Sequence, residues 1–179
     1  RLGLALITAQ CLVTVLSVSL RGSVQQSQRE LAGVTAIKPM LSLIQLMQQH
    51  RDMANGVLAG NAKLKDKVAA NAGEIAEAIG IADAALAAQG DIVGQQEDWK
   101  PLKDEWTALA NEWPELTGPA SFTAHTAVVQ RAMQIVTGIG DSSGLVMDPD
   151  LDSYYLANTA VFVMPETLER LAVIRGAGN

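Results

Sequence analysis

Apolar residues recur three or four positions apart through most of this chain, and this spacing constrains its fold more than any other feature. Between Leu64 and Leu86 the apolar residues are 4, 4, 3, 4, 3 and 4 positions apart, which places them on one face of a helix. A second stripe from Trp99 to Leu116 contains all three tryptophans and is more typical of a core than of a ligand platform. β-branched runs bounded by turn residues are scarce, so the sequence predicts an all-α fold.

Glycines and prolines divide this pattern into four long helices that follow an N-terminal segment. Pro39 should kink the first helix and Pro165 should kink the fourth. Pro114 and a break at residues 117–121 interrupt the third, with Ser121 as the N-cap of the part that follows. Because the loops are short, consecutive helices should be antiparallel neighbours, which gives an up-down-up-down four-helix bundle. The expected helices cover residues 21–61, 64–89, 99–139 and 148–176.

The N-terminal segment from Leu2 to Leu20 contains no charged residue and lies between Arg1 and Arg21. Its nineteen residues would span roughly 28 Å as a helix, close to the hydrocarbon thickness of a bilayer. We therefore expect residues 1–20 to be a transmembrane anchor. A cleaved signal peptide and a helix buried inside a soluble bundle are the two alternatives. An arginine at each end gives no indication of orientation.

Composition argues against several functional classes. The net charge is −6 and no cluster of Lys or Arg occurs, which argues against a nucleic-acid partner. Cys11 is the only cysteine, so the CxxC pairs of zinc and haem sites are absent. No glycine-rich phosphate loop follows a predicted strand, and the Ser142 and Ser143 hydroxyls have no histidine nearby in sequence. We expect no enzymatic activity, no cofactor and no metal.

Three segments of the sequence contain recognisable motifs. The first contains the His50-Arg51 pair in a long leucine-rich helix, the second is an FxxH motif, and the third is DSSGLVMDPDLDSYYL, of which DPDLDSYYL is the most specific piece. These segments are residues 31–60, 122–125 and 141–156. Together they resemble the periplasmic sensing regions of proteobacterial methyl-accepting chemotaxis proteins, which some membrane diguanylate cyclases and sensor kinases share.

This resemblance implies a function in signal transduction. Residues 21–179 would be an extracytoplasmic, ligand-sensing region in the periplasm, anchored in the bacterial inner membrane. A homodimer is also expected, because a symmetric pair lets the anchors and the first helix pack in parallel. Such receptors continue into a second membrane helix and a cytoplasmic output region, so further sensing helices are expected beyond residue 179. The alternatives are a structural or protein-interaction bundle without a small-molecule ligand, and a soluble carrier of a cofactor.

The expected topology also predicts a ligand site at the end of the bundle far from the membrane. The first helix ends near Leu58, and the fourth was expected to begin at that same end and run back. Arg51 would bind an anionic small molecule through two hydrogen bonds from its guanidinium group. Alternatively, it would form an ion pair with Asp148 or Asp152 and hold the two helices together. We expect His125 to lie roughly 30 Å from His50, as a core histidine that shares no metal with it. The candidate ligand-binding residues are His50, Arg51, Asp148, Asp152, Tyr154 and Tyr155.

Overall fold

A computed structural model describes residues 2–147 and 151–177 of the chain. Helices account for nearly all of these residues, and no strand occurs among them, which confirms the predicted all-α fold. Asp148, Pro149 and Asp150, expected to begin the last helix, lie outside the described residues. The side chains outside the description are those of Leu2, Leu4, Ala5, Thr8, Ala9, Met147, Leu151, Ser153, Tyr154 and Ala177.

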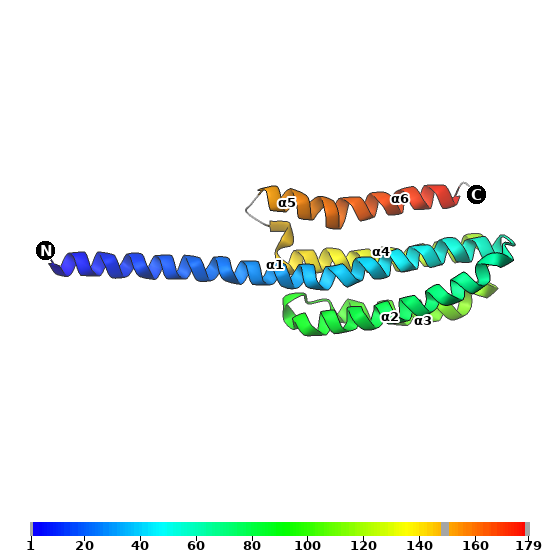
Figure 1. The fold of residues 1–179 in the computed structure, drawn as a ribbon, viewed down its shortest axis with the longest axis horizontal. Coiled ribbons are helices and arrows are strands. Elements are labelled where there is room, and N and C mark those ends of the chain that lie inside the picture. The colour runs from blue at the N-terminus through cyan, green and yellow to red at the C-terminus, as the bar shows by residue number, and fades with distance from the viewer. Residues whose placement is uncertain (1, 148–150, 178–179) are drawn as a thin grey trace.

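The first helix, α1, is one uninterrupted element from Leu2 to Leu58. It continues through Pro39, where a kink or break was expected, and it spans the length of the molecule in Figure 1. Its second half lies among the other helices. Its first half extends beyond them with its described apolar side chains exposed, from Leu6 (66%) to Leu20 (66%).

Helices α2 (Lys65–Gln89), α3 (Gln96–Glu112) and α4 (Gly118–Ser143) lie against the second half of α1. The prediction of one interrupted helix over 99–139, with an N-cap at Ser121, is wrong, because the chain reverses at this break and α4 already begins at Gly118. The turn follows a short 3-10 helix, Trp113–Glu115, and the Thr117 hydroxyl caps α4 by accepting a hydrogen bond from the Ala120 amide. This reversal carries the start of α4 back to the C-terminal end of α1.

The last helical segment contains α5 (Leu151–Ala157), a π-helix (Asn158–Val163) and α6 (Met164–Ala177). Figure 1 shows that this segment begins beside the middle of α1 and runs parallel to it. The expectation that it starts at the far end and runs back is therefore wrong. The cause is the additional reversal between α3 and α4, which changes the end of the bundle from which the segment departs.

A single apolar core lies between α1, α2, α3 and α4. Leu43 and Ile75 are fully buried there, and Trp99 and Trp106 are each 5% exposed, which confirms the tryptophan stripe as core. The segment containing α6 lies on the other side of α1 and α4. Two phenylalanine rings fix its approach: Phe162 occupies the space over Gly140, and Phe122 occupies the space over Gly176.

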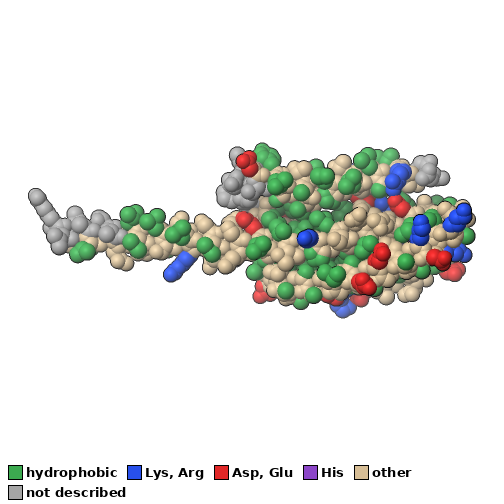
Figure 2. Space-filling view, in the orientation of Figure 1, with side chains coloured by type: hydrophobic (Ala, Val, Ile, Leu, Met, Phe, Trp, Pro, Cys, Tyr) green, Lys and Arg blue, Asp and Glu red, His purple; other side chains and the backbone are tan. Residues whose placement is uncertain are grey.

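The described residues contain no helix whose length and apolar character would suit it to crossing a membrane. Within the first half of α1, the apolar side chains that are described are more than half exposed, and the adjoining body of the molecule leaves them uncovered. Figure 2 shows green apolar side chains along this protruding helix and again along the outer side of α6.

Candidate functional site

Four polar side chains are buried together near the C-terminal end of α1, and we call them the buried polar cluster. Its members are His50 and Arg51 on α1, His125 on α4 and Glu169 on α6. Each is at most 4% exposed. Because burying polar or charged groups is costly unless they are paired, their partners determine what this cluster can do.

Arg51 joins α1 to α6 through a buried ion pair. Both terminal nitrogens of Arg51 donate to the Glu169 carboxylate, with Nη2 3.2 Å from Oε2. Nη1 also donates to the Thr126 hydroxyl at 3.1 Å, and the Phe122 ring lies 4.8 Å from the guanidinium carbon. Gln48 donates to the same carboxylate at 2.8 Å. Glu169 therefore neutralises a guanidinium that has no exposed surface.

This pairing decides between the two roles expected for Arg51. The guanidinium pins α1 to the last helix, as in the ion-pair alternative, but the partner that the structure shows is Glu169. Asp148, one of the two partners expected, lies outside the described residues. A neighbouring pair, Asp52 with Arg175, ties the same two helices at the surface. Arg51 is thus enclosed by protein partners and is not open to an anionic ligand.

His50 and His125 are in direct contact, so the predicted separation of roughly 30 Å is wrong. Nδ1 of His50 lies 3.0 Å from Nε2 of His125. The error came from treating α3 and α4 as one helix, which placed Phe122 and His125 far from the end of α1. The other part of that prediction is confirmed, because His125 is a buried histidine with satisfied ring nitrogens.

The protonation of this histidine pair follows from its partners. Nδ1 of His125 lies 2.7 Å from the Ser121 carbonyl oxygen, which can only accept, so this nitrogen carries the proton. Burial lowers the pKa of His125, and burial together with the His125 charge lowers the pKa of His50 from 6.5 to about 4. Both rings are neutral at pH 7. His50 therefore donates from Nδ1 to Nε2 of His125, and its own Nε2 is left as an acceptor.

Two aromatic rings hold His50 in this orientation. Trp106 and Trp113 meet the imidazole edge to face, with ring centroids 5.0 and 5.7 Å away. Within the described residues, no hydrogen-bond partner is found for Nε2 of His50. The tryptophan stripe thus contributes to the core and also fixes the direction of one imidazole.

The remaining predicted site residues do not join this cluster. Asp152 lies seventeen residues before Glu169, about 25 Å along a helix that runs parallel to α1. Tyr155, which is 62% exposed, is on the same distant turn. Each makes interactions of its own there. Asp148 and the Tyr154 side chain lie outside the description, so the structure brings together only His50 and Arg51 of the six.

Glu169 is the central residue that sequence reasoning missed. It lies on the inner face of the last segment with Phe162, Pro165 and Gly176, at spacings of three, four and seven residues. A charged residue on such an inner face needs a buried partner of opposite charge. That pattern was the available signal, and the incorrect direction of the helix concealed it.

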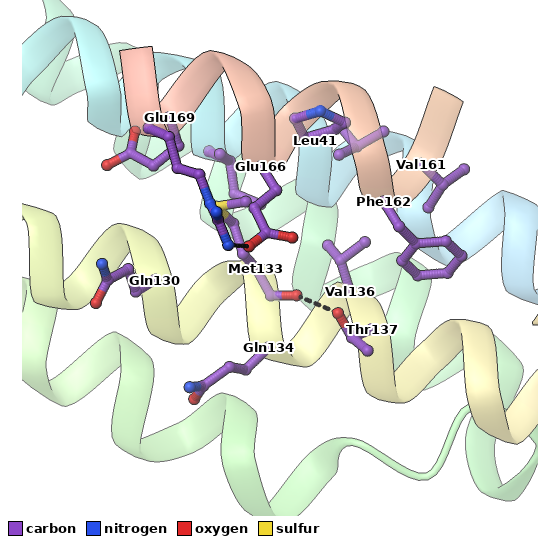
Figure 3. Close-up of a pocket in the computed structure, with 13 residues that line it drawn as sticks. Leu41, Gln130, Met133, Gln134, Val136, Thr137, Val161, Phe162, Glu166 and Glu169 are labelled. Carbon is purple, nitrogen blue, oxygen red and sulfur yellow. Dashed lines mark hydrogen bonds and ion pairs between the residues drawn. The ribbon is translucent and has the colours of Figure 1, made fainter. Parts of the chain in front are cut away.

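A groove of about 400 Å³ lies between α1, α4 and the α6 segment (Figure 3). Its apolar walls include Leu41, Val136 and Phe162. The charged groups along it are already paired, since Glu166 accepts from Arg170 at 2.6 Å and Glu169 accepts from Arg51. The groove thus offers apolar surface under a helix whose attachment depends on ion pairs.

A second cavity, of about 460 Å³, lies on the opposite side of α1, between the end of α1, the start of α2 and the end of α3. Its walls are almost wholly apolar, and His50 and Lys65 are the only ionisable residues that line it. Its size is typical of small-molecule sites. The lining residues are His50, Val57, Leu58, Lys65, Val68, Ala69, Ala72, Ala110, Trp113 and Pro114.

Comparison of the chain with protein-family models, curated proteins and solved structures finds no match in any of the three.

Proposed function

We propose that this chain is the membrane-anchored, extracytoplasmic sensing region of a bacterial signal-transduction receptor of the chemotaxis-receptor type, with no enzymatic activity of its own. The observation that carries the proposal is the continuity of α1. One helix of 57 residues connects an exposed apolar segment with the buried polar cluster near its other end. A rigid helix can transmit a displacement from one to the other.

The exposed half of α1 supports the membrane part of the proposal. Leu12, Val15 and Leu16 are 61%, 65% and 52% exposed and have no part of the described body beside them. Apolar patches of this extent on soluble proteins usually mark a protein or membrane contact. The uncharged run 2–20 has the length of a bilayer core, so lipid is the cover we propose, with the body in the periplasm.

The attachment of α6 supports the sensing part of the proposal. Its inner face is held by the Arg51–Glu169 pair and by two phenylalanine contacts, above the groove of about 400 Å³. A small-molecule ligand that favours one position of α6 or α1 over another would shift the helices by about 1–2 Å. The shift requires different affinities for the two arrangements.

A homodimer fits this arrangement, since α6 exposes Leu168, Leu171 and Ile174 on its outer face at 58–69%. In a symmetric pair the anchors would run parallel. Cys11, exposed on the protruding half of α1, is a natural reporter. We expect mild oxidation of the full chain in detergent to give a disulfide-linked dimer. Cys11→Ser should give none, and a wild-type chain that stays monomeric would contradict the parallel dimer.

Flotation with vesicles of phosphatidylethanolamine and phosphatidylglycerol tests the anchor. The wild-type chain should float with the lipid, whereas Leu12→Lys combined with Val15→Lys should remain in the aqueous fraction. Ile81→Lys, at a 62% exposed apolar position on α2, is the matched control and should float like the wild type. Equal flotation of all three proteins, or of none, would refute membrane anchoring by this helix.

A protein-interaction bundle without a small-molecule ligand is the alternative. A thermal-shift screen of the purified chain with organic acids, amino acids and nitrate separates the two, since only the sensing proposal predicts a stabilising compound. Because Arg51 is enclosed by Glu169, an anion that stabilises the chain should act at another position.

A further inference from the structure

We propose that the cavity beside His50 binds a small, uncharged, largely apolar molecule with one O–H or N–H group, which donates a hydrogen bond to Nε2 of His50. The cavity could serve the sensing role proposed above. Its test needs only the folded helical body, so failure of membrane anchoring and failure of this site are distinguishable.

A chain of hydrogen bonds begins at Ser121 and ends at His50. The Ser121 carbonyl accepts from Nδ1 of His125, and Nε2 of His125 accepts from Nδ1 of His50. Each imidazole in a neutral pair has one donor and one acceptor nitrogen. The acceptor left at the end of the chain is Nε2 of His50.

The residue that carries this acceptor lies at the wall of the cavity. His50 lines the cavity although the residue is only 1% exposed. Among the described residues, none is recorded as a hydrogen-bond partner of Nε2. An acceptor with no protein partner on a residue that lines a cavity can accept a hydrogen bond from a donor that enters that cavity.

The other walls of the cavity are mostly apolar. Val57, Leu58, Val68 and Ala72 supply aliphatic surface, and Trp113 supplies an aromatic face. Apart from His50, only Lys65 at the start of α2 is ionisable, and its side chain is exposed. A ligand that is buried here gains from apolar contact and from one hydrogen bond, and it meets no buried ion that would require a charge.

The groove under α6 is a weaker candidate for the same ligand. Its carboxylates and guanidinium groups already satisfy one another, as the Glu166–Arg170 and Glu169–Arg51 pairs show. Its other polar lining residues, Gln130, Gln134 and Thr137, are exposed, so water can satisfy them. The cavity at His50 differs in this one respect, which is what selects it.

The experiment uses the full chain with 15N-labelled histidine, in one detergent throughout, titrated with 2-naphthol and with 2-methoxynaphthalene. In the free protein the His50 Nε2 resonance should be that of an unprotonated nitrogen. Addition of 2-naphthol should move it upfield in a saturable way. The methoxy compound has no donor, and we expect it to bind about 2- to 10-fold more weakly and to leave this resonance in place.

Two variants locate the site. Ala72→Leu adds bulk to the cavity wall and should weaken 2-naphthol binding at least about 10-fold. Ala76→Leu is one turn further along α2 at an exposed position and should bind like the wild type. Circular dichroism checks that both variants are folded. If Ala72→Leu is not folded, Ala69→Leu, at another position that lines the cavity, is used in its place.

Several outcomes would overturn the proposal. If Nε2 of His50 carries the proton in the free protein, it cannot accept a hydrogen bond. If 2-naphthol does not move the Nε2 resonance, the ligand does not bind to this nitrogen. Equal affinity for the two naphthalenes would exclude the hydrogen bond. Equal binding by wild-type and folded Ala72→Leu protein would place the ligand elsewhere.

Discussion

The two sides of α1 are held by different kinds of interaction. Towards α2, α3 and α4 the contact is apolar, with Leu43, Met47 and Ile75 each no more than 1% exposed. Towards α6, Glu169 is the only buried side chain that the described part of α6 contributes, and Leu168, Leu171 and Ile174 are exposed on its outer face. The first side resembles a conventional core, and the second resembles a docking surface.

This difference suggests which part of the molecule can move. Apolar packing is dense and loses energy with any displacement, so α1 to α4 should behave as one unit. An ion pair in a partly open interface has a nearby alternative, because water can solvate both charges when the helix moves away. The α6 segment is therefore the element that a ligand or a partner could reposition at low cost.

The largest expected effect is at the apolar side. Leu43→Ala removes a fully buried side chain between α1 and its neighbours and should lower the free energy of unfolding by about 2–5 kcal/mol. Urea denaturation followed by circular dichroism measures the change. Ile81→Ala, at a 62% exposed position, should stay within about 0.5 kcal/mol. Equal losses at the two positions would mean that the apolar side is not a packed core.

Acid should also weaken the apolar side, because His50 is buried there beneath two tryptophans. Its pKa in the folded state is about 4, below the usual 6.5, so the unfolded chain binds the extra proton between these values. The free energy of unfolding is then highest above about pH 6.5 and falls as the pH is lowered to 4, by on the order of 3 kcal/mol. Urea denaturation at pH 7 and pH 4.5 measures this loss.

His50→Phe is the comparison for this pH dependence. It keeps a ring against Trp106 and Trp113 and removes the titrating group. All carboxylates remain, so their titration is common to both proteins. The variant should lose less stability than the wild type between pH 7 and pH 4.5. Identical losses would show that His50 does not titrate with a lowered pKa.

On the other side of α1, Glu169→Ala should release α6 and leave the rest of the bundle in place. The variant loses charge-assisted hydrogen bonds, and the helix can move so that water solvates Arg51, which limits the cost to about 2 kcal/mol. Hydrogen exchange should become faster across residues 164–177 and stay unchanged in α2. Glu166→Ala removes an exposed pair and should change exchange little. Faster exchange throughout the chain would mean that the two sides unfold together.

The same contrast explains how far the sequence could predict this structure. Helical spacing identified the apolar stripe of α2 and the tryptophan stripe of α3, because a helix that is buried on one face has apolar residues every three or four positions. It did not reveal the reversal at Thr117–Pro119, since two antiparallel helices and one interrupted helix have the same periodicity. That one reversal determines which residues meet Arg51, so the partner Glu169 and the contact between His50 and His125 could not be predicted.

The smallest predicted effect compares two glycines in helices. At Gly140 a Cβ would collide with the Phe162 ring that attaches the α6 segment, whereas at Gly73 on α2 it would meet open space. Gly73→Ala should raise the free energy of unfolding by about 0.5–1 kcal/mol, because alanine favours helix. Gly140→Ala should lose that gain, displace Phe162 and speed exchange around residues 158–163 by an equivalent of about 1 kcal/mol. If both substitutions stabilise the protein equally, Phe162 does not fix the α6 segment, and the ion pair at Glu169 alone holds that side of α1.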